Sequence, residues 1–404
     1  MSSLVTSAPT AEARPDEVPA AEAAPLLGGA APALALALAM FVEAVGYGMV
    51  APTLPFLARQ AGADESRIGF LVGLYAAVGL LASIPFGALA NRHGRKTLIL
   101  VGLACLTAAS LGFVRAPSYL WLVVARFTQG LGATAIWVGG LTIAADLSPA
   151  DAMGESLSWL TGSWALGFVV GPALGGVGSV RFPFVLYAIL SAAALVAGLV
   201  ALPETGCPGV RTTIGGILRV LRLPAVLASA AATFAMSFFY GTVEAFLPLM
   251  VDARGVGRTG IGLLFVVAGI PSIVLPQIVG RLADRLGDRR MVAFGLLYAA
   301  ALNAVFMLLM RAIPLWPLFL LVGLVEVAIY VPAIALLNRG MGRDERIFAT
   351  GSHSYAFSAG FFLGPVFGGL LLPLGGPGLM FAMLTAVTLA ALATVSASRV
   401  RSAA

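Results

Sequence analysis

Twelve apolar stretches, each long enough to cross a lipid bilayer, constrain this chain more than any other feature. A helix rises ~1.5 Å per residue, so about 20 apolar residues span the ~30 Å hydrocarbon core. Hydrophobic residues make up 60% of the chain and charged residues only 10%, more apolar surface than a water-soluble fold can bury. We therefore predict an all-α polytopic membrane protein with twelve transmembrane helices. The stretches lie at about 32–57, 68–90, 97–114, 119–145, 156–177, 182–202, 226–251, 260–278, 291–310, 315–337, 352–372 and 379–397.

The last six stretches repeat the first six at a constant shift of 193 residues. The register holds through the loops as well as the apolar stretches, which indicates a parallel duplication. Halves of this kind place a binding site at their interface, near the bilayer midplane. Matched pairs are Tyr47 and Tyr240, Gly48 and Gly241, Pro55 and Pro248, Gly130 and Gly323, and Asp151 and Asp344.

The duplication predicts the domain organisation. Two six-helix halves, 30–202 and 226–398, are joined by a linker at 203–225. Residues 213–222 of this linker form either a short amphipathic helix on the membrane surface or part of a plain connection. The ends, 1–29 and 399–404, are expected to be tails. Residues 1–29 carry one basic residue and no apolar core, so they do not resemble a signal peptide.

The basic residues predict the orientation in the membrane. If the N-terminus is inside, sixteen of the 24 Lys and Arg residues fall in inner segments, seven in outer loops and one, Arg126, within a span. Positive charge concentrates on the cytoplasmic side of membrane proteins. We expect both termini in the cytoplasm and the chain in the cell (inner or plasma) membrane. The net charge of +6 is therefore attributed to lipid contact, and no nucleic-acid partner is expected.

Four ionisable residues lie deep within the predicted spans: Glu43, Arg126, Glu244 and Glu326, in spans 1, 4, 7 and 10. Burying a charge in hydrocarbon costs at least ~2.5 kcal/mol, so such residues face a cavity, find partners or bind protons. Burial and mutual repulsion are expected to keep at least one of the three acids protonated. A neutral acid that is hydrogen-bonded to backbone remains the alternative for any single one.

Aromatic residues near these charges are candidates for the lining of the same cavity. Tyr47, Tyr240 and Trp137 lie in spans 1, 7 and 4. Aromatic rings suit flat or cationic lipophilic compounds. Each ring taken singly could equally pack against a helix or face lipid.

A glycine–proline motif occurs in span 5 and again in span 11. In the first copy, glycines at i, i+4 and i+8 form a smooth helix face, and the proline bends the helix. We expect Gly171 and its counterpart Gly364 to face a neighbouring helix at the interface between the halves. The motif residues are Gly167, Gly171, Pro172, Gly175, Gly176, Gly360, Gly364, Pro365 and Gly368.

A second motif occupies the predicted inner loops after spans 2 and 8. Both copies combine glycines with arginines, and one copy has Asn91 where the other has Asp284. These residues are expected to form a cytoplasmic gate. They are Gly87, Asn91, Arg92, Gly94 and Arg95 in the first copy, and Gly280, Asp284, Arg285 and Gly287 in the second.

Together with Arg126-Phe-Thr-Gln-Gly130 in span 4, these motifs resemble the major facilitator superfamily. The glycine–proline motif resembles its drug:proton antiporter branch, and the stretch from Glu43 to Pro55 is similar to the first helix of tetracycline-type and multidrug exporters. The resemblance implies that Glu43 binds substrate and protons, and that a gate acid latches the inner side. The chain departs from the pattern at Asn91, where the family usually has aspartate, and at Glu43, where tetracycline exporters typically have aspartate.

We therefore predict a transporter that exports small lipophilic or cationic compounds by alternating access, driven by the proton gradient. A proton-coupled importer of a small nutrient is the first alternative, and a non-transporting polytopic membrane protein a more distant one. No phosphate-binding glycine loop, metal-ligand spacing or catalytic triad is present, so neither an enzyme nor a metal site is expected. The expected partners are a small-molecule substrate, protons and lipid, with no organic cofactor, and the protein is expected to be monomeric.

Overall fold

The computed structural model describes residues 29–148, 153–205, 223–309, 314–338 and 343–398. The regular elements of these ranges are helices. Residues 206–222 of the predicted linker, which include 213–222, and the tails 1–28 and 399–404 lie outside the described residues. The helices are α1 (Ala30–Val50), α2 (Leu54–Gln60), α3 (Glu65–His93), α4 (Arg95–Arg115), α5 (Tyr119–Leu147), α6 (Met153–Gly175), α7 (Phe182–Ala201), α9 (Pro224–Asp252), α10 (Arg258–Val274), α11 (Pro276–Leu286), α12 (Asp288–Leu309), α13 (Leu315–Asn338) and α14 (Arg343–Ala397).

The described residues contain the twelve predicted spans. Ten helices are long and apolar enough to cross a membrane, and α10 with α11 forms an eleventh span that bends by 49°. The long helix α14 is broken at Gly375 and Gly376, where Gly376 has φ 63°, so residues 349–374 and 377–397 cross separately. The first predicted span divides into α1 and α2, because Pro52 and Pro55 lack the amide hydrogens that would continue the helix.

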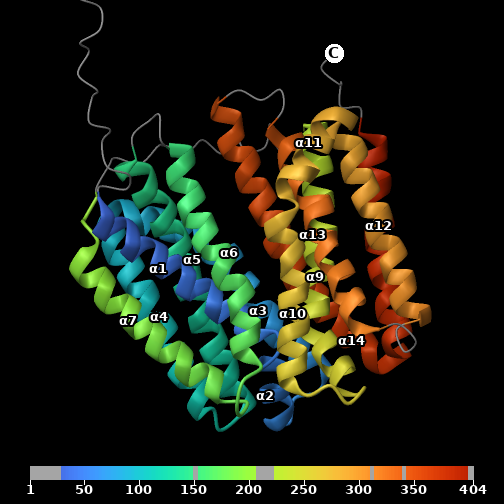
Figure 1. Ribbon diagram of the computed structural model, residues 1–404, viewed down its shortest axis with the longest axis horizontal. Coiled ribbons are helices and arrows are strands. Elements are labelled where there is room, and N and C mark those ends of the chain that lie inside the picture. The colour runs from blue at the N-terminus through green and yellow to red at the C-terminus, as the bar shows by residue number, and fades with distance from the viewer. Residues whose placement is uncertain (1–28, 149–152, 206–222, 310–313, 339–342, 399–404) are drawn as a thin grey trace, which may run out of the picture.

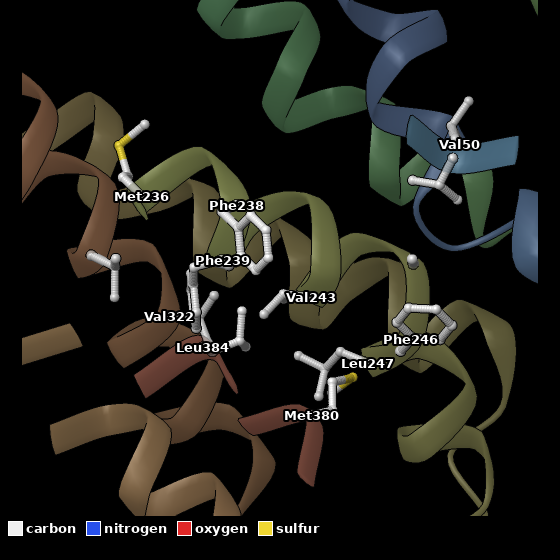
Figure 2. Close-up of a cluster of buried hydrophobic side chains, with 14 of the residues drawn as sticks. Val50, Met236, Phe238, Phe239, Val243, Phe246, Leu247, Val322, Met380 and Leu384 are labelled. Carbon is white, nitrogen blue, oxygen red and sulfur yellow. The ribbon is translucent and has the colours of Figure 1, made fainter. Parts of the chain in front are cut away.

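The helices form two bundles that stand side by side (Figure 1). Helices α1 to α7 form the N-terminal half and α9 to α14 the C-terminal half. Figure 2 shows part of the core of the C-terminal half, where Phe239 and Leu247 of α9 lie near Val322 of α13 and near Met380 and Leu384 of α14. Removing these side chains from water and lipid fixes the three helices against one another.

The halves meet near the end of the bundle that is remote from the start of α1. Here α3 packs on α14, and α6 packs on α10. The Ser66 hydroxyl donates to the Gly369 carbonyl (3.2 Å), and the Thr259 hydroxyl donates to the Gly176 carbonyl (2.9 Å). Both donors and both acceptors are related by the shift of 193 residues, so the two contacts are equivalent by the repeat. We call this end of the molecule the sealed end.

The α6–α10 contact at the sealed end carries an additional charged group. The Arg258 guanidinium donates to the carbonyls of Gly175 (3.0 Å) and Gly178 (2.9 Å). These carbonyls lie at the C-terminal end of α6, where the helix dipole favours a cation. Toward the other end the bundles diverge (Figure 1), and a methyl group added at Gly162 of α6 or Gly280 of α11 would meet no atom within 4 Å. We call this the open end.

The glycine–proline motif packs differently from our expectation. A Cβ added at Gly171 would lie 2.6 Å from the Val45 carbonyl oxygen of α1, and one added at Gly364 would meet the Phe238 carbonyl of α9. Both partners belong to the same half as the glycine. The prediction that Gly171 and Gly364 lie between the halves is therefore wrong, because their stripe of glycines faces the first helix of its own half.

The adjacent face of each motif helix makes the contact between the halves. The Pro172 carbonyl lies against Gly262 of α10, and the Pro365 carbonyl lies against Gly69 of α3. Residues at i and i+1 point about 100° apart around a helix, so one motif serves two neighbours. Gly176 also lies against α10 and belongs to this second face of the motif helix.

The gate motifs also differ from our expectation, because most of their residues are helical. Helix α3 continues to His93 and so includes Gly87, Asn91 and Arg92, while α11 includes Gly280, Asp284 and Arg285. Each helix ends at a glycine with positive φ, Gly94 (91°) and Gly287 (92°), and the next helix starts directly after it. The apolar pattern did not predict the last turns of α3 and α11 as helix, because these turns lie beyond the predicted hydrocarbon region.

Arg95, the first residue of α4, joins α4 to α5. It forms an ion pair with Asp146 and donates to the Thr142 carbonyl (3.1 Å), and both carboxylate and guanidinium are mostly buried. The gate residue Arg95 therefore acts within the N-terminal half in this conformation.

Candidate functional site

Glu43 of α1 is buried, and both of its carboxylate oxygens accept hydrogen bonds. The Tyr75 hydroxyl of α3 donates to Oε1 (2.5 Å), and the Trp164 indole of α6 donates to Oε2 (2.8 Å). The Trp164 ring stacks on Phe168 (5.3 Å between centroids) and packs edge-on against Trp137 (5.7 Å). Glu43 therefore sits in an aromatic box that belongs entirely to the N-terminal half.

Arg126 of α5 is fully buried beside this box. It donates to the Gln129 side-chain oxygen (2.8 Å) and to the Val72 carbonyl (3.1 Å), and it stands over the Tyr75 ring at 4.8 Å from the centroid. Its Nε has no partner within the described residues. The guanidinium lies within electrostatic range of Glu244 without forming an ion pair with it. The positive charge is thus balanced by a ring face, an amide and a carboxylate at longer range.

Tyr47, one helical turn after Glu43, connects the two halves. Its hydroxyl donates to Oε2 of Glu244 on α9 (3.0 Å). Its ring lies 5.4 Å from Tyr75 and 5.8 Å from Phe168, and 6.0 Å from Phe361 of α14. The other oxygen of Glu244, Oε1, is buried and unpartnered among the described residues.

A narrow pocket of about 40 Å³ lies between the halves at this position. Both Glu244 and Glu326 line it, and Glu326 accepts a hydrogen bond from Ser272 (2.7 Å). Tyr240 also lines it and donates to the Val322 carbonyl (3.0 Å). The lining residues are Tyr47, Gly48, Ala51, Phe168, Pro172, Tyr240, Val243, Glu244, Phe265, Ala268, Gly269, Val322 and Glu326.

The structure therefore divides the site residues identified from sequence into two groups. Tyr47, Tyr240, Glu244 and Glu326 surround the pocket. Glu43, Arg126 and Trp137 lie behind the pocket wall in the N-terminal half, connected to it through Tyr75 and Tyr47.

Sequence reasoning missed three polar side chains that complete the site: Tyr75, Trp164 and Gln129. The repeat offers a signal that could have found them, because their counterparts at the shift of 193 residues are Ala268, Phe357 and Val322. A polar group that only one half retains in a buried helix is not needed for the fold that both halves share. Such differences between the copies point to function.

The comparison with known families assigns the chain. A sequence model described as Major Facilitator Superfamily matches residues 36–259 and 229–403. The chain belongs to the major facilitator superfamily. Members of this family are transporters, so the protein is a multi-pass membrane transporter and not an enzyme.

Several curated relatives carry resistance names. The chain is 24% identical over 355 residues to Multidrug resistance protein 2 of Bacillus subtilis, which covers 83% of this chain and 87% of the relative. It is 24% identical over 345 residues to Quinolone resistance protein NorA of Staphylococcus aureus (82% and 87% covered). It is also 35% identical over 148 residues to the uncharacterized MFS-type transporter C18.02 of Schizosaccharomyces pombe, a match that covers only 33% of that protein.

Solved structures share the fold at low sequence identity. A bacterial homolog of the human lysosomal transporter Spinster, in an inward-facing and unoccupied conformation, has a TM-score of 0.70 at 16% identity, with 90% of this chain and 93% of that chain covered. The peptide transporter POT in complex with sulfate has a TM-score of 0.75 at 15% identity (91% and 94% covered).

Proposed function

We propose that this transporter exports small lipophilic or cationic compounds in exchange for protons. The observation that carries the proposal is the pocket between the halves, where Glu244 and Glu326 are set among aromatic side chains. A buried carboxylate binds either a proton or an organic cation, so the two ligands compete for one charge. Competition at a shared site is the simplest basis for exchange. The multidrug and quinolone resistance names of the relatives support the direction of transport.

We propose that both termini lie in the cytoplasm of a cell whose plasma membrane holds the protein. The excess of Lys and Arg in the segments that would then face inward supports this orientation. The open end then faces the cytoplasm and the sealed end faces outward. In this conformation a cytoplasmic compound approaches the pocket while the contacts of α3 with α14 and of α6 with α10 close the outer side.

In this proposal Glu43, behind the pocket wall, is a proton-linked residue in addition to the pocket carboxylates. Its two oxygens accept hydrogen bonds from Tyr75 and Trp164. Protonation converts one oxygen into a donor and so disrupts one of these bonds. The Arg126 guanidinium lies over the Tyr75 ring, and the Tyr47 ring packs beside it. A shift of Tyr75 when Glu43 is protonated therefore disturbs Tyr47, which lines the pocket.

Transport by everted membrane vesicles tests the function, with ethidium as a lipophilic cationic probe. Acidifying the vesicle lumen should drive ethidium inward in vesicles with the wild-type protein and not in vesicles without it. Glu43→Gln should abolish this gradient-driven uptake at unchanged expression, because the amide keeps the shape but cannot ionise, and Glu43→Asp should keep part of it. Uptake by right-side-out vesicles with an acidic exterior would instead identify an importer. Wild-type uptake by Glu43→Gln would leave the proton-linked role to the pocket carboxylates Glu244 and Glu326.

A further inference from the structure

We propose that the hydrogen bond from Tyr47 to Glu244 is a lock that holds the empty, deprotonated carrier closed at the sealed end. A proton or a substrate cation on Glu244 releases the lock. The inference rests on the proposed exchange of protons for substrate, and it assigns Tyr47 as a positioning residue for that exchange.

The placement of Tyr47 supports a lock between the halves. Its hydroxyl belongs to the N-terminal half and its acceptor, Glu244, to the C-terminal half. The ring is held by Tyr75 and Phe168 from its own half and by Phe361 from the other. The bond therefore forms only when the halves are together at this level, and the hydroxyl has little freedom to find another acceptor.

The repeat shows that this bond is not a requirement of the fold. The counterpart of Tyr47 is Tyr240, whose hydroxyl donates to the Val322 carbonyl within its own half. A backbone carbonyl does not change its charge with pH or with substrate. Of these two tyrosine hydroxyls, that of Tyr47 donates to an acceptor whose charge does change.

The two oxygens of Glu244 have different surroundings. Oε2 accepts from Tyr47, whereas Oε1 is buried, unpartnered in the described part of the chain, and belongs to a residue that lines the pocket. Oε1 is thus available to a proton or a substrate cation. Neutralising the carboxylate there weakens the bond at Oε2, because a charged acceptor makes a stronger hydrogen bond than a neutral one.

Other charged and titratable groups near Glu244 come from three neighbouring helices. Arg126 of α5 lies within electrostatic range of Glu244, and Glu326 of α13 lines the same pocket. Tyr75 of α3 donates to Glu43 and packs beside Tyr47, the donor to Glu244. The walls from α10 and α14 contribute Phe265, Ala268, Gly269 and Phe361, which do not titrate.

Exchange of protons for substrate requires that the empty carrier does not reorient. The carrier must reorient when it holds a proton or a substrate and must not reorient when it holds neither, since empty reorientation dissipates the gradient. Both ligands neutralise Glu244 and so free the halves to part at the sealed end. The empty carrier keeps a charged Glu244, keeps the bond, and waits at the open end for cytoplasmic substrate.

Distance measurements between spin labels test the lock without any transport. Labels are attached at Pro117→Cys, before α5, and Ala253→Cys, after α9, in a Cys105→Ala, Cys207→Ser background. Both positions are exposed and lie at the sealed end, one on each half. Purified protein in lipid nanodiscs is measured without substrate at about pH 8, where carboxylates are ionised in water, and at about pH 5.

We expect the short distance to dominate in the wild type at the higher pH and the long distance to gain at the lower pH. Tyr47→Phe keeps the ring and removes the hydroxyl, so it should raise the ratio of long to short distance at the higher pH by about tenfold or more. Glu244→Gln should do the same, and the double variant should add nothing further. Tyr298→Phe is the matched control, because its hydroxyl donates to the Leu321 carbonyl within the C-terminal half.

Each outcome decides the proposal. A wild-type distribution in Tyr47→Phe at both pH values overturns the lock, and so does an additive effect in the double variant. The same shift in Tyr298→Phe also overturns it, since any lost hydroxyl would then have that effect. The vesicle assay reports separately on the proposed function, so export with no shift in distance rejects the lock alone, and a shift without export rejects the exporter alone.

Discussion

Replacing Gly171 by alanine should separate α1 from α6 and weaken the N-terminal half. The added Cβ would lie 2.6 Å from the Val45 carbonyl oxygen and 2.9 Å from Gly48 Cα, and both of these are backbone atoms that cannot rotate away. Overpacking of this kind costs about 1–3 kcal/mol. Gly162→Ala on the same helix is the control, because its Cβ would meet no atom within 4 Å.

The two variants gain the same helix propensity, so the difference between them isolates the packing cost. Reversible unfolding in mixed detergent micelles should give a free energy of unfolding about 1–3 kcal/mol lower for Gly171→Ala than for Gly162→Ala. Gradient-driven ethidium transport should fall as well, because α1 carries Glu43 and Tyr47 and its displacement lengthens their hydrogen bonds. Equal unfolding free energies in the two variants would refute the reasoning.

Three further substitutions have expected outcomes. Arg258→Gln removes two hydrogen bonds to carbonyls at the end of α6 and should favour opening of the sealed end by about 1 kcal/mol, seen as more of the long spin-label distance; an unchanged distribution would contradict it. Trp164→Phe keeps the ring stack but removes the donor to Glu43, so gradient-driven ethidium transport should fall, and wild-type transport would count against the aromatic box. Arg95→Met should lower the unfolding free energy more than the double change of Arg95→Met with Asp146→Asn, because the single change leaves a buried carboxylate unpaired; the reverse order would show that the pair contributes little.

The spans and the duplication could be predicted from the sequence because each depends on the order of residues along the chain and not on which helices meet. Apolar length gives the spans, and the constant register gives the relation between the halves. The pocket carboxylates Glu244 and Glu326 could also be predicted, since charge within a span is costly and seldom lacks a cavity or a partner. Their place on one pocket follows from the structure alone.

What a helix face packs against could not be predicted in the same way. The stripe of glycines containing Gly171 indicates that another helix packs closely against it. Whether that helix is α1 or α10 depends on the arrangement of all the helices. Tyr75 and Trp164 were missed for a related reason. Aromatic residues are common in membrane helices, and their hydrogen bonds to Glu43 appear only when three helices are brought together.

At two places in the contact between the halves a carbonyl group packs directly against a glycine, with Pro172 O against Gly262 and Pro365 O against Gly69. At these two places no side chain must change rotamer before the halves separate, and glycine loses no side-chain entropy when they meet again. Each cycle can therefore break and remake these two contacts at the sealed end without rearranging side chains there. Selection on substrate can change the side chains that line the pocket while these two main-chain contacts stay as they are.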